Sequence, residues 1–264
     1  MPDHPPDQSD RLAVADSIAL LRRFTPARIG LGRAGSGQLT ATGLQFKLDH
    51  ARARDAVHTV LDFEALGQLL RERGWSVVHV HSAAGDRTEY LRRPDLGRRL
   101  SPTGYPLFEA GTRGSDVAIV AADGLSALAI ETNLLPVLHC LRSLLLARHR
   151  TIGPLVLVEQ GRVAIGDEIG ELLDAKLTLV LIGERPGLSA ADSLGAYLTW
   201  RPRIGTMDSG RNCISNIRPA GLSPEEAAAQ IIDVIEHAFA HEMTGVRLNA
   251  RTVATGVPVV THRL

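Results

Sequence analysis

The sequence is poor in cysteine, in aromatic residues and in net charge, and each shortage argues against a class of protein. Two cysteines, Cys140 and Cys213, make neither a disulfide framework nor a cysteine-rich zinc site by themselves, which favours a reducing compartment. Aromatic residues are 4% of the 264 residues, too few for a platform that stacks single-stranded nucleic acid. Basic and acidic residues balance at 29 each, which disfavours a broad electrostatic grip on nucleic acid or an anionic membrane.

Targeting signals and long apolar runs are also missing. The apolar run over 177–182 (LTLVLI) is far too short to span a bilayer. The start, MPDHPPDQSD, is polar and proline-rich and lacks the basic and apolar regions of a signal peptide. We therefore expect residues 1–10 to be disordered. The sequence contains no G-x-S-x-G, P-loop or H-E-x-x-H motif, so it shows no self-contained catalytic constellation.

The apolar periodicity that is present predicts an α/β fold. Helical patterns cover 11–24, 39–60, 62–73, 126–148 and 166–174, and a last helix begins at the capping signature of Ser223. Strands are expected at 75–81, 116–124, 154–161, 176–184, 196–202 and 213–217. The alternation predicts a mainly parallel sheet covered by helices on both faces. We place a helical N-terminal region at 11–100 and the α/β domain at 101–264.

A glycine-rich loop offers one functional hypothesis. Gly30, Gly32 and Gly35 match the G-x-G-x-x-G fingerprint, whose backbone N–H groups approach a pyrophosphate closely. A helical segment precedes the loop, whereas the fingerprint belongs in a βαβ unit. A loop that contacts an anion or another subunit is therefore favoured, and a nucleotide-dependent oxidoreductase is kept as the alternative.

Two loops follow strands, at the edge of the sheet where ligands bind in α/β proteins. Asp123 in the first loop could hold a ligand hydroxyl or amide, or Asp123 or Ser126 could cap the next helix. Glu184 in the second loop could accept hydrogen bonds from a ligand. By spacing alone, a surface pair of Arg185 with a glutamate in a Pro-Gly turn is the favoured interpretation.

Three further features carry both a functional and a structural interpretation. Cys213 is favoured as a small buried strand residue over a nucleophile, since no histidine partner is evident, and a ligand contact is a third interpretation. His79 and His81 share a strand face and could bind a metal, but core or surface histidines are favoured. The four arginines of 92–99 could meet a phosphate, a carboxylate or a subunit, although a solvated, ion-paired turn is the default.

Six blocks of the chain, taken together, resemble the small (light) subunit of ethanolamine ammonia-lyase. They are GRAG (32–35), RPDLGRRL (93–100), ADGLS (122–126), GRVAIGDEIGELLDAK (161–176), GERPGLS (183–189) and CISNIRPAG (213–221). The resemblance runs from about Arg11 to Leu248. It implies a Rossmann-like domain that closes over adenosylcobalamin at the interface with a large TIM-barrel subunit. The resulting hetero-oligomer would convert ethanolamine to acetaldehyde and ammonia by radical chemistry, with ethanolamine bound mainly by the large subunit.

The resemblance also implies which residues contact the cofactor. Val163, Glu184 and Cys213 match cobalamin contacts of the family, so Cys213 becomes a ligand neighbour without a nucleophilic role. Asp123 and Arg185 are expected beside the ligand or at the subunit interface. No catalytic residue or metal ligand is assigned to this chain. Because the D-x-H-x-x-G motif is missing, the cofactor is expected to keep its own benzimidazole on cobalt.

Two expectations concern the surroundings of the chain. We expect a cytoplasmic enzyme, because the sequence shows no extension of the kind that targets some family members to a protein-shelled microcompartment. The tail after Leu248 lies outside the resemblance and has no assigned role. A third hypothesis is a non-enzymatic scaffold with drifted cofactor loops, which would assemble with a large subunit but support no turnover.

Overall fold

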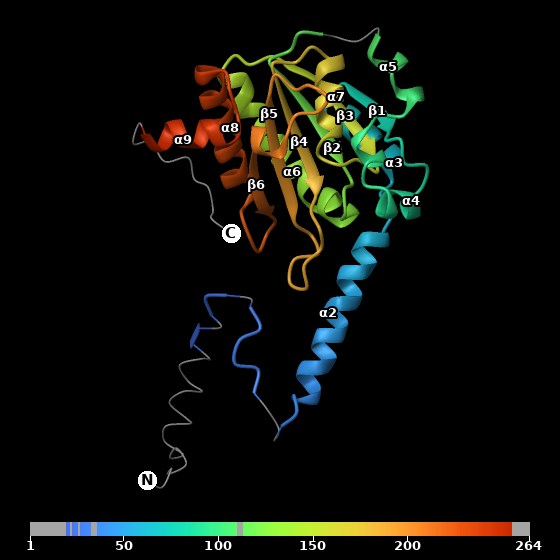
Figure 1. The fold of residues 1–264 in the computed structure, drawn as a ribbon, viewed down its shortest axis with the longest axis vertical. Helices are drawn as coiled ribbons and strands as arrows, with labels where there is room; N and C mark the ends of the chain where they lie inside the picture. Colours follow the sequence, from blue (N-terminus) through green and yellow to red (C-terminus); the bar gives the residue numbers. More distant parts are fainter. Residues whose placement is uncertain (1–19, 22, 26, 33–35, 110–112, 255–264) are drawn as a thin grey trace.

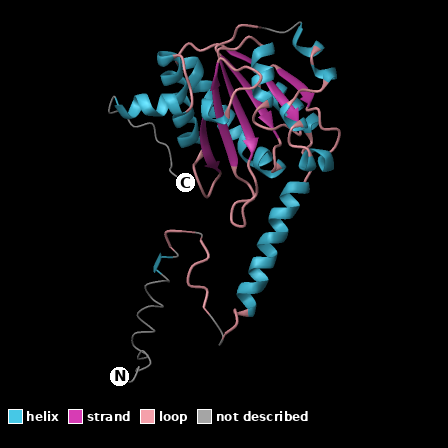
Figure 2. Cartoon of the chain, viewed as in Figure 1, coloured by secondary structure: helices cyan, strands magenta, loops and turns pink. Residues whose placement is uncertain are grey.

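A six-stranded sheet forms the centre of the molecule (Figures 1 and 2). The computed structural model describes residues 20–254 except 22, 26, 33–35 and 110–112. The strands are β1 (Val77–His81), β2 (Val117–Ala122), β3 (Ile152–Glu159), β4 (Leu177–Gly183), β5 (Leu194–Trp200) and β6 (Arg211–Ile217). Each expected strand is found, with its ends shifted by a few residues. The expected disordered start and most of the helix expected over 11–24 lie outside the described residues.

The strand directions correct the expectation of a mainly parallel, Rossmann-like sheet. The order is β1-β3-β2-β4-β5-β6, and the pairs among β1, β3, β2 and β4 are parallel. The pairs β4/β5 and β5/β6 are antiparallel, so the sheet is mixed. Parallel neighbours need a long crossover, whereas antiparallel neighbours need only a short loop. The segments 184–193 and 201–210 contain no α-helix, so each folds the chain back beside the strand it has just left.

Helices cover both faces of this sheet. Alternate residues of a strand point to opposite faces, so Ile119 of β2 packs with the first group of helices and Val120 with the second. Both β2 and β4 are buried at every position, as is typical of strands covered on two sides. The first group is α3 (Phe63–Glu72), α6 (Ala127–Ala147) and α8 (Pro224–His241), and the second includes α5 (Pro106–Glu109) and α7 (Ile165–Leu172).

The helices begin at the side chains that the sequence indicated. Asp62 accepts a hydrogen bond from the Ala65 N–H, and Ser126 accepts one from the Ala129 N–H. Ser223 and Glu226 form the expected capping box at the start of α8. Among the described helices, α6 is the one long and apolar enough to cross a membrane by length and composition, which the short apolar runs did not suggest. Its buried residues belong to the core beneath the sheet, as in a core helix of a globular protein.

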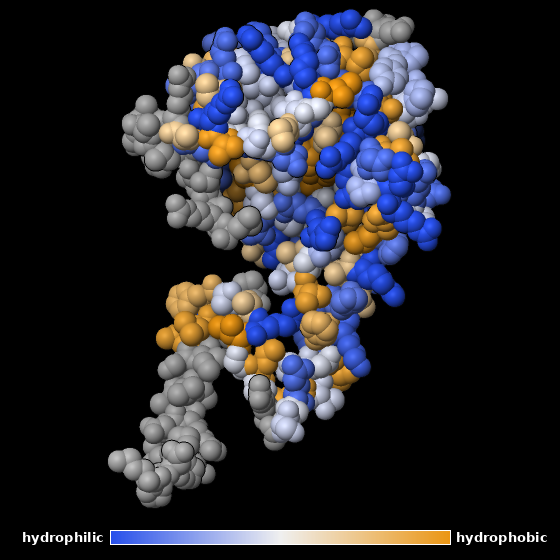
Figure 3. All heavy atoms as spheres, viewed as in Figure 1, coloured by the Kyte–Doolittle hydropathy of each residue, from blue (hydrophilic) through white to orange (hydrophobic). Residues whose placement is uncertain are grey.

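One helix extends away from this body. Helix α2 (Thr40–His58) confirms the helix expected at 39–60, and Figure 1 shows it reaching out from the sheet. In the space-filling view of Figure 3, this part of the molecule projects below the main body. Within α2 only Ala56 is buried, while Leu44 and Phe46 are exposed. Strand β1, which precedes the expected domain boundary at residue 101, pairs with β3 inside the same sheet.

Candidate functional site

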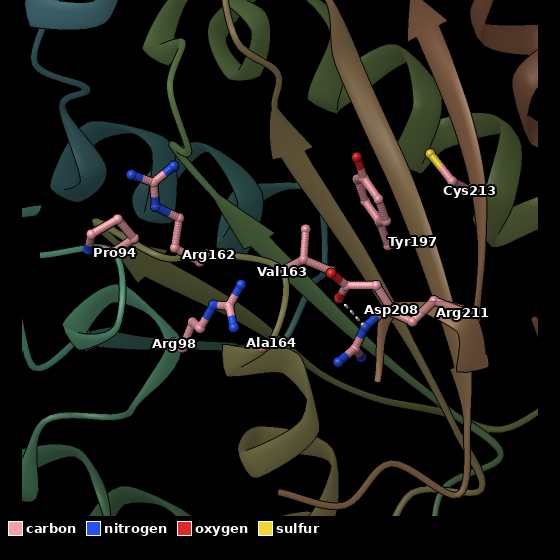
Figure 4. Close-up of a pocket in the computed structure, with 9 residues that line it drawn as sticks. All are labelled: Pro94, Arg98, Arg162, Val163, Ala164, Tyr197, Asp208, Arg211 and Cys213. Atoms are coloured by element: carbon pink, nitrogen blue, oxygen red, sulfur yellow. Dashed lines mark hydrogen bonds and ion pairs between the residues drawn. The ribbon is translucent and has the colours of Figure 1, made fainter. Parts of the chain in front are cut away.

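Two adjoining hollows lie on the α7 side of the sheet. The smaller, about 290 Å³, is lined by Val163 and Cys213, and the larger, about 430 Å³, by Val163 and Glu184. They share Arg162, Val163 and Tyr197, so they form one continuous region of surface. In Figure 4, Val163 lies between Arg98 and Arg162 on one side and Tyr197 with Cys213 on the other. The fold therefore brings together three residues that are far apart in sequence. Their role as cobalamin contacts stays a prediction.

Val163 is held by the loop that connects β3 to α7. The loop leaves β3 through Gln160, whose φ is +55°, and Gly161, where a Cβ would lie 2.9 Å from the Ala122 side chain. Backbone N–H of Arg162 donates to the Gly97 carbonyl at 2.7 Å, which ties the loop to a neighbouring turn. These contacts hold the loop in place. The half-buried Val163 lines both hollows.

Glu184 follows β4 directly and is oriented by neutral donors. Hydroxyl groups of Ser193 and Ser215 donate to its carboxylate at 2.5 and 2.6 Å, and the Asn216 N–H donates at 3.3 Å. Among the described residues no cation forms an ion pair with Glu184, so the favoured surface pair with Arg185 is wrong for this glutamate. The half-buried carboxylate is thus held at the edge of the larger hollow, where it can accept further hydrogen bonds.

Cys213 lies in the middle of β6, opposite Tyr197 of β5. Neighbouring atoms partly bury the thiol, although the residue as a whole is exposed, and this raises the pKa of the thiol. A hydrogen bond with Tyr197 lowers this pKa, and the nearby charge of Glu184 raises it. The thiol therefore stays protonated at neutral pH, and no histidine lines either hollow in the described part of the chain. The favoured prediction for Cys213, a small buried strand residue, is right about the strand, but the residue is exposed. These features suit a ligand contact and not a nucleophile.

A stack of two arginines and a tyrosine supports one wall of the site. The ring of Tyr90, in α4 (Arg87–Arg92), lies 4.1 Å from the guanidinium carbon of Arg162 and 4.9 Å from that of Arg87. The Tyr90 hydroxyl donates to the Gly161 carbonyl at 3.0 Å. Neither Tyr90 nor Tyr197 is predicted from the sequence, because no local motif or pattern marks them. Arg162 adjoins Val163 in the same block, a signal that could have found it.

Asp123 and Ser126 turn out to have different roles. Ser126 caps α6, which confirms the prediction that Asp123 or Ser126 caps this helix. Asp123 is buried next to the larger hollow, where its Oδ2 lies 3.4 Å from the guanidinium nitrogen Nη1 of Arg87. The same nitrogen donates to the Gly124 carbonyl at 2.8 Å, and Arg87 Nε donates to the Val57 carbonyl at 2.8 Å. Arg87 thus joins the end of α2 to the loop that follows β2.

Asp123 is expected to make stability depend on pH. Burial raises its pKa to about 6, against the opposing charge of Arg87 and backbone N–H groups. Because the folded pKa lies above the ordinary value of about 3.9, the folded chain binds the proton more tightly, and this contribution to stability is lost as pH rises. Relative to Asp123→Asn, wild type should lose about 2 kcal/mol of unfolding free energy between about pH 4.5 and about pH 7. Urea unfolding at several pH values measures this.

The matched control is Asp174→Asn, which removes a carboxylate from an exposed turn. Its pH dependence should parallel that of wild type. Equal pH dependence in wild type and Asp123→Asn would contradict the assignment.

The arginine-rich segment is in large part structural. Arg99 donates to both carboxylate oxygens of Glu168 in α7 at 3.1 Å, and the Leu100 N–H donates at 2.8 Å. The Tyr105 hydroxyl donates to the same carboxylate. Arg93 pairs with Asp95 on the surface, as the default interpretation predicted. These contacts hold the segment against α7, so that its Pro94 and Arg98 line the smaller hollow.

Replacing Glu168 with glutamine is expected to destabilise the chain by about 2 kcal/mol, because a buried carboxylate with several donors is lost while Arg99 stays half exposed. Burial alone would raise the pKa of Glu168, but the hydrogen bonds from Arg99, Tyr105 and Leu100 lower it below its ordinary value. Urea unfolding at neutral pH measures the loss. Glu171→Gln, on the exposed side of the same helix, should change stability by less than about 0.5 kcal/mol. Similar losses in the two variants would contradict this role.

The remaining candidates lie away from the hollows. Residues 27–32, before and within the glycine-rich loop, form no strand, so Gly30 and Gly32 lack the context of a dinucleotide site, and Gly35 lies outside the described residues. His79 Nε2 lies 2.8 Å from Glu159, and Phe63 stacks on the His79 ring. No group of three histidine, cysteine or acidic residues in the described part of the chain is suited to hold a metal ion.

Comparison with known proteins identifies the family of the chain. The family model "Ethanolamine ammonia-lyase light chain (EutC)" matches residues 15–249. The chain is 52% identical over 238 residues to the "Ethanolamine ammonia-lyase small subunit" of Azotobacter vinelandii, covering 86% of each. It is 51% identical over 237 residues to the protein of that name from Xanthomonas campestris, covering 88% of this chain and 87% of the relative. The protein of that name from Pseudomonas aeruginosa is 52% identical over 232 residues, with 86% of this chain and 85% of the relative covered. The chain therefore belongs to the ethanolamine ammonia-lyase small (light) subunit family.

Proposed function

We propose that this chain is the small subunit of an adenosylcobalamin-dependent ethanolamine ammonia-lyase, and that it forms one wall of the cobalamin site where it meets the large subunit. The family supports a subunit of this carbon–nitrogen lyase. The observation that carries the cobalamin assignment is the convergence of Val163, Glu184 and Cys213 on two adjoining hollows. A wide, flat ligand would reach all three, since they come from the β3–α7 loop, the end of β4 and the middle of β6.

The chemistry of the lining residues fits a corrin, whose rim carries amide groups that both donate and accept hydrogen bonds. Glu184 supplies a fixed acceptor, Tyr197 and Arg162 supply donors, and Val163 supplies an apolar contact. No histidine of the described residues lines the hollows, so this chain offers no imidazole to cobalt there. The arrangement favours a cofactor that keeps its own benzimidazole on the metal.

The work left to this chain is to hold the cofactor and to exclude water. The bound cofactor supplies the radical chemistry through homolysis of its cobalt–carbon bond. Glu184 is already oriented by Ser193 and Ser215, so little ordering is needed when it meets a ligand. The protonated thiol of Cys213 and the apolar Val163 present a surface without a strong nucleophile. Ethanolamine would lie on the partner's side of the site.

The names of the relatives also support a partner. A small subunit implies a large one, and we propose that this chain assembles with the large subunit of ethanolamine ammonia-lyase into a hetero-oligomer. We place the complex in the cytoplasm, where reducing conditions suit the two free cysteines, Cys140 and Cys213.

The test is ethanolamine turnover in dim light with adenosylcobalamin, for this chain alone and for this chain mixed with its large subunit. Activity in the mixture and none with this chain alone is the expected result. A stable complex that neither binds cobalamin nor turns over ethanolamine would overturn the proposal in favour of a scaffold. If no complex forms and the isolated chain binds a nicotinamide or flavin nucleotide, the result would instead favour a nucleotide-dependent oxidoreductase that uses the glycine-rich loop.

A further inference from the structure

The two hollows are lined by more arginines than carboxylates, since the only carboxylates among their described lining residues are Asp208, which pairs with Arg211, and Glu184. Arg98 and Arg162 line the smaller hollow, and Arg162 and Arg185 line the larger. Arg211 also lines the smaller hollow, but it is paired with the buried carboxylate of Asp167. Figure 4 shows Arg98 and Arg162 together on the side away from Tyr197 and Cys213.

Arg98, Arg162 and Arg185 have no carboxylate partner in the part of the chain that the structure describes. Among the described residues, no aspartate or glutamate forms an ion pair with Arg98, Arg162 or Arg185. Arg162 donates to the Tyr90 carbonyl at 3.3 Å, while its Nε is buried and has no hydrogen-bond partner. Burial lowers the pKa of Arg162, and the charges of Arg87, Arg185 and Arg98 lower it further, against the opposing contribution of Tyr90.

A partly buried guanidinium beside like charges is costly unless an anion offsets it. The Tyr90 ring compensates in part, since a cation over an aromatic face is attracted to it. The contact with the Tyr90 ring leaves the Nε donor of Arg162 without a partner. A guanidinium group is the side-chain group best shaped to bind phosphate oxygens. The cluster is therefore complete only with an anionic group in the hollow.

We propose that Arg162, assisted by Arg98 and Arg185, binds a phosphate ester group of the ligand that occupies the hollows. The inference rests on the proposed function, because in cobalamin this group is the phosphodiester of the nucleotide tail. That phosphodiester is the one anionic group of the intact molecule, whose other polar side chains are neutral amides. The arginine cluster thus orients the cofactor, with the nucleotide tail on the arginine side and the corrin edge toward Glu184 and Cys213.

The experiment compares ligands that differ in the phosphate. The complex with the large subunit is dialysed against cobinamide, which lacks the tail, and against cobinamide phosphate, which keeps the phosphate without the base; visible absorbance gives the bound fraction. Wild type is expected to bind cobinamide phosphate about tenfold or more tightly than cobinamide, since charge-assisted hydrogen bonds distinguish the two. Arg162→Gln should lower the affinity for cobinamide phosphate more than the affinity for cobinamide, and so remove most of this preference.

Two further variants keep the test decisive. Arg98→Gln changes an exposed side chain, so this variant should fold normally. It should reduce the preference for cobinamide phosphate over cobinamide by less than Arg162→Gln does. Arg92→Gln, at an exposed position of the same segment that lines neither hollow, is the matched control and should keep the full preference. Equal loss of both ligands in Arg162→Gln and an unchanged preference in Arg98→Gln would overturn the inference while the proposed function stands. If the wild-type complex retains no more adenosylcobalamin than a dialysis without protein, the proposed function itself is wrong.

Discussion

Replacing Gly183 with alanine is expected to destabilise the chain by about 3 kcal/mol or more. A Cβ at Gly183 would overlap the backbone carbonyl oxygens of Ser126 and Asp123. Backbone atoms cannot rotate away as the end of a flexible side chain does. The Leu125 N–H also donates to the Gly183 carbonyl at 2.9 Å, so the same close approach holds the loops after β2 and β4 together.

The matched control is Gly43→Ala. Gly43 lies within α2, and a Cβ there would meet no atom within 4 Å. Because alanine is the better helix former, this variant should be stabilised by about 0.5–1 kcal/mol. Urea unfolding of both variants measures the contrast. A Gly183→Ala variant as stable as wild type would mean that the two loops are not packed as described.

Replacing Glu184 with alanine is expected to weaken adenosylcobalamin binding to the reconstituted complex by about tenfold or more. The carboxylate is held by Ser193, Ser215 and the Asn216 N–H at the edge of the larger hollow, so its loss removes a pre-oriented acceptor. Its donors are small hydroxyl groups and a backbone amide of exposed residue Asn216, and the free energy of unfolding should fall by about 1 kcal/mol at most. Equilibrium dialysis with the cofactor and urea unfolding measure the two quantities separately.

The control for this variant is Glu131→Ala, which removes the same charge from an exposed position of α6 on the opposite side of the sheet. It should keep wild-type cofactor affinity. Cofactor affinity and turnover in Glu184→Ala that match those of Glu131→Ala would refute the assignment of Glu184. A large loss of stability in Glu184→Ala would instead assign the residue to the fold.

The candidate site was accessible from the sequence in one respect and hidden in another. Val163, Glu184 and Cys213 were identified because they stand in blocks that resemble a family, and the fold places all three on adjoining hollows. Their neighbours Tyr90 and Tyr197 were not identified, because each approaches the site from a part of the chain that carries no local signal. Tyr90 lies 71 residues before the Gly161 carbonyl to which it donates, a separation that no periodic pattern encodes.

The sequence by itself determined the local structure and the family. Caps at Asp62, Ser126 and Ser223 and the runs of apolar residues depend on neighbours a few positions away, so they could be predicted one segment at a time. Only the tertiary structure decided the direction of β5 and β6 and the gathering of unpaired arginines around the hollows. A buried strand has the same apolar pattern in either direction, and the charge around a hollow is a sum over segments that meet only after the sheet has formed.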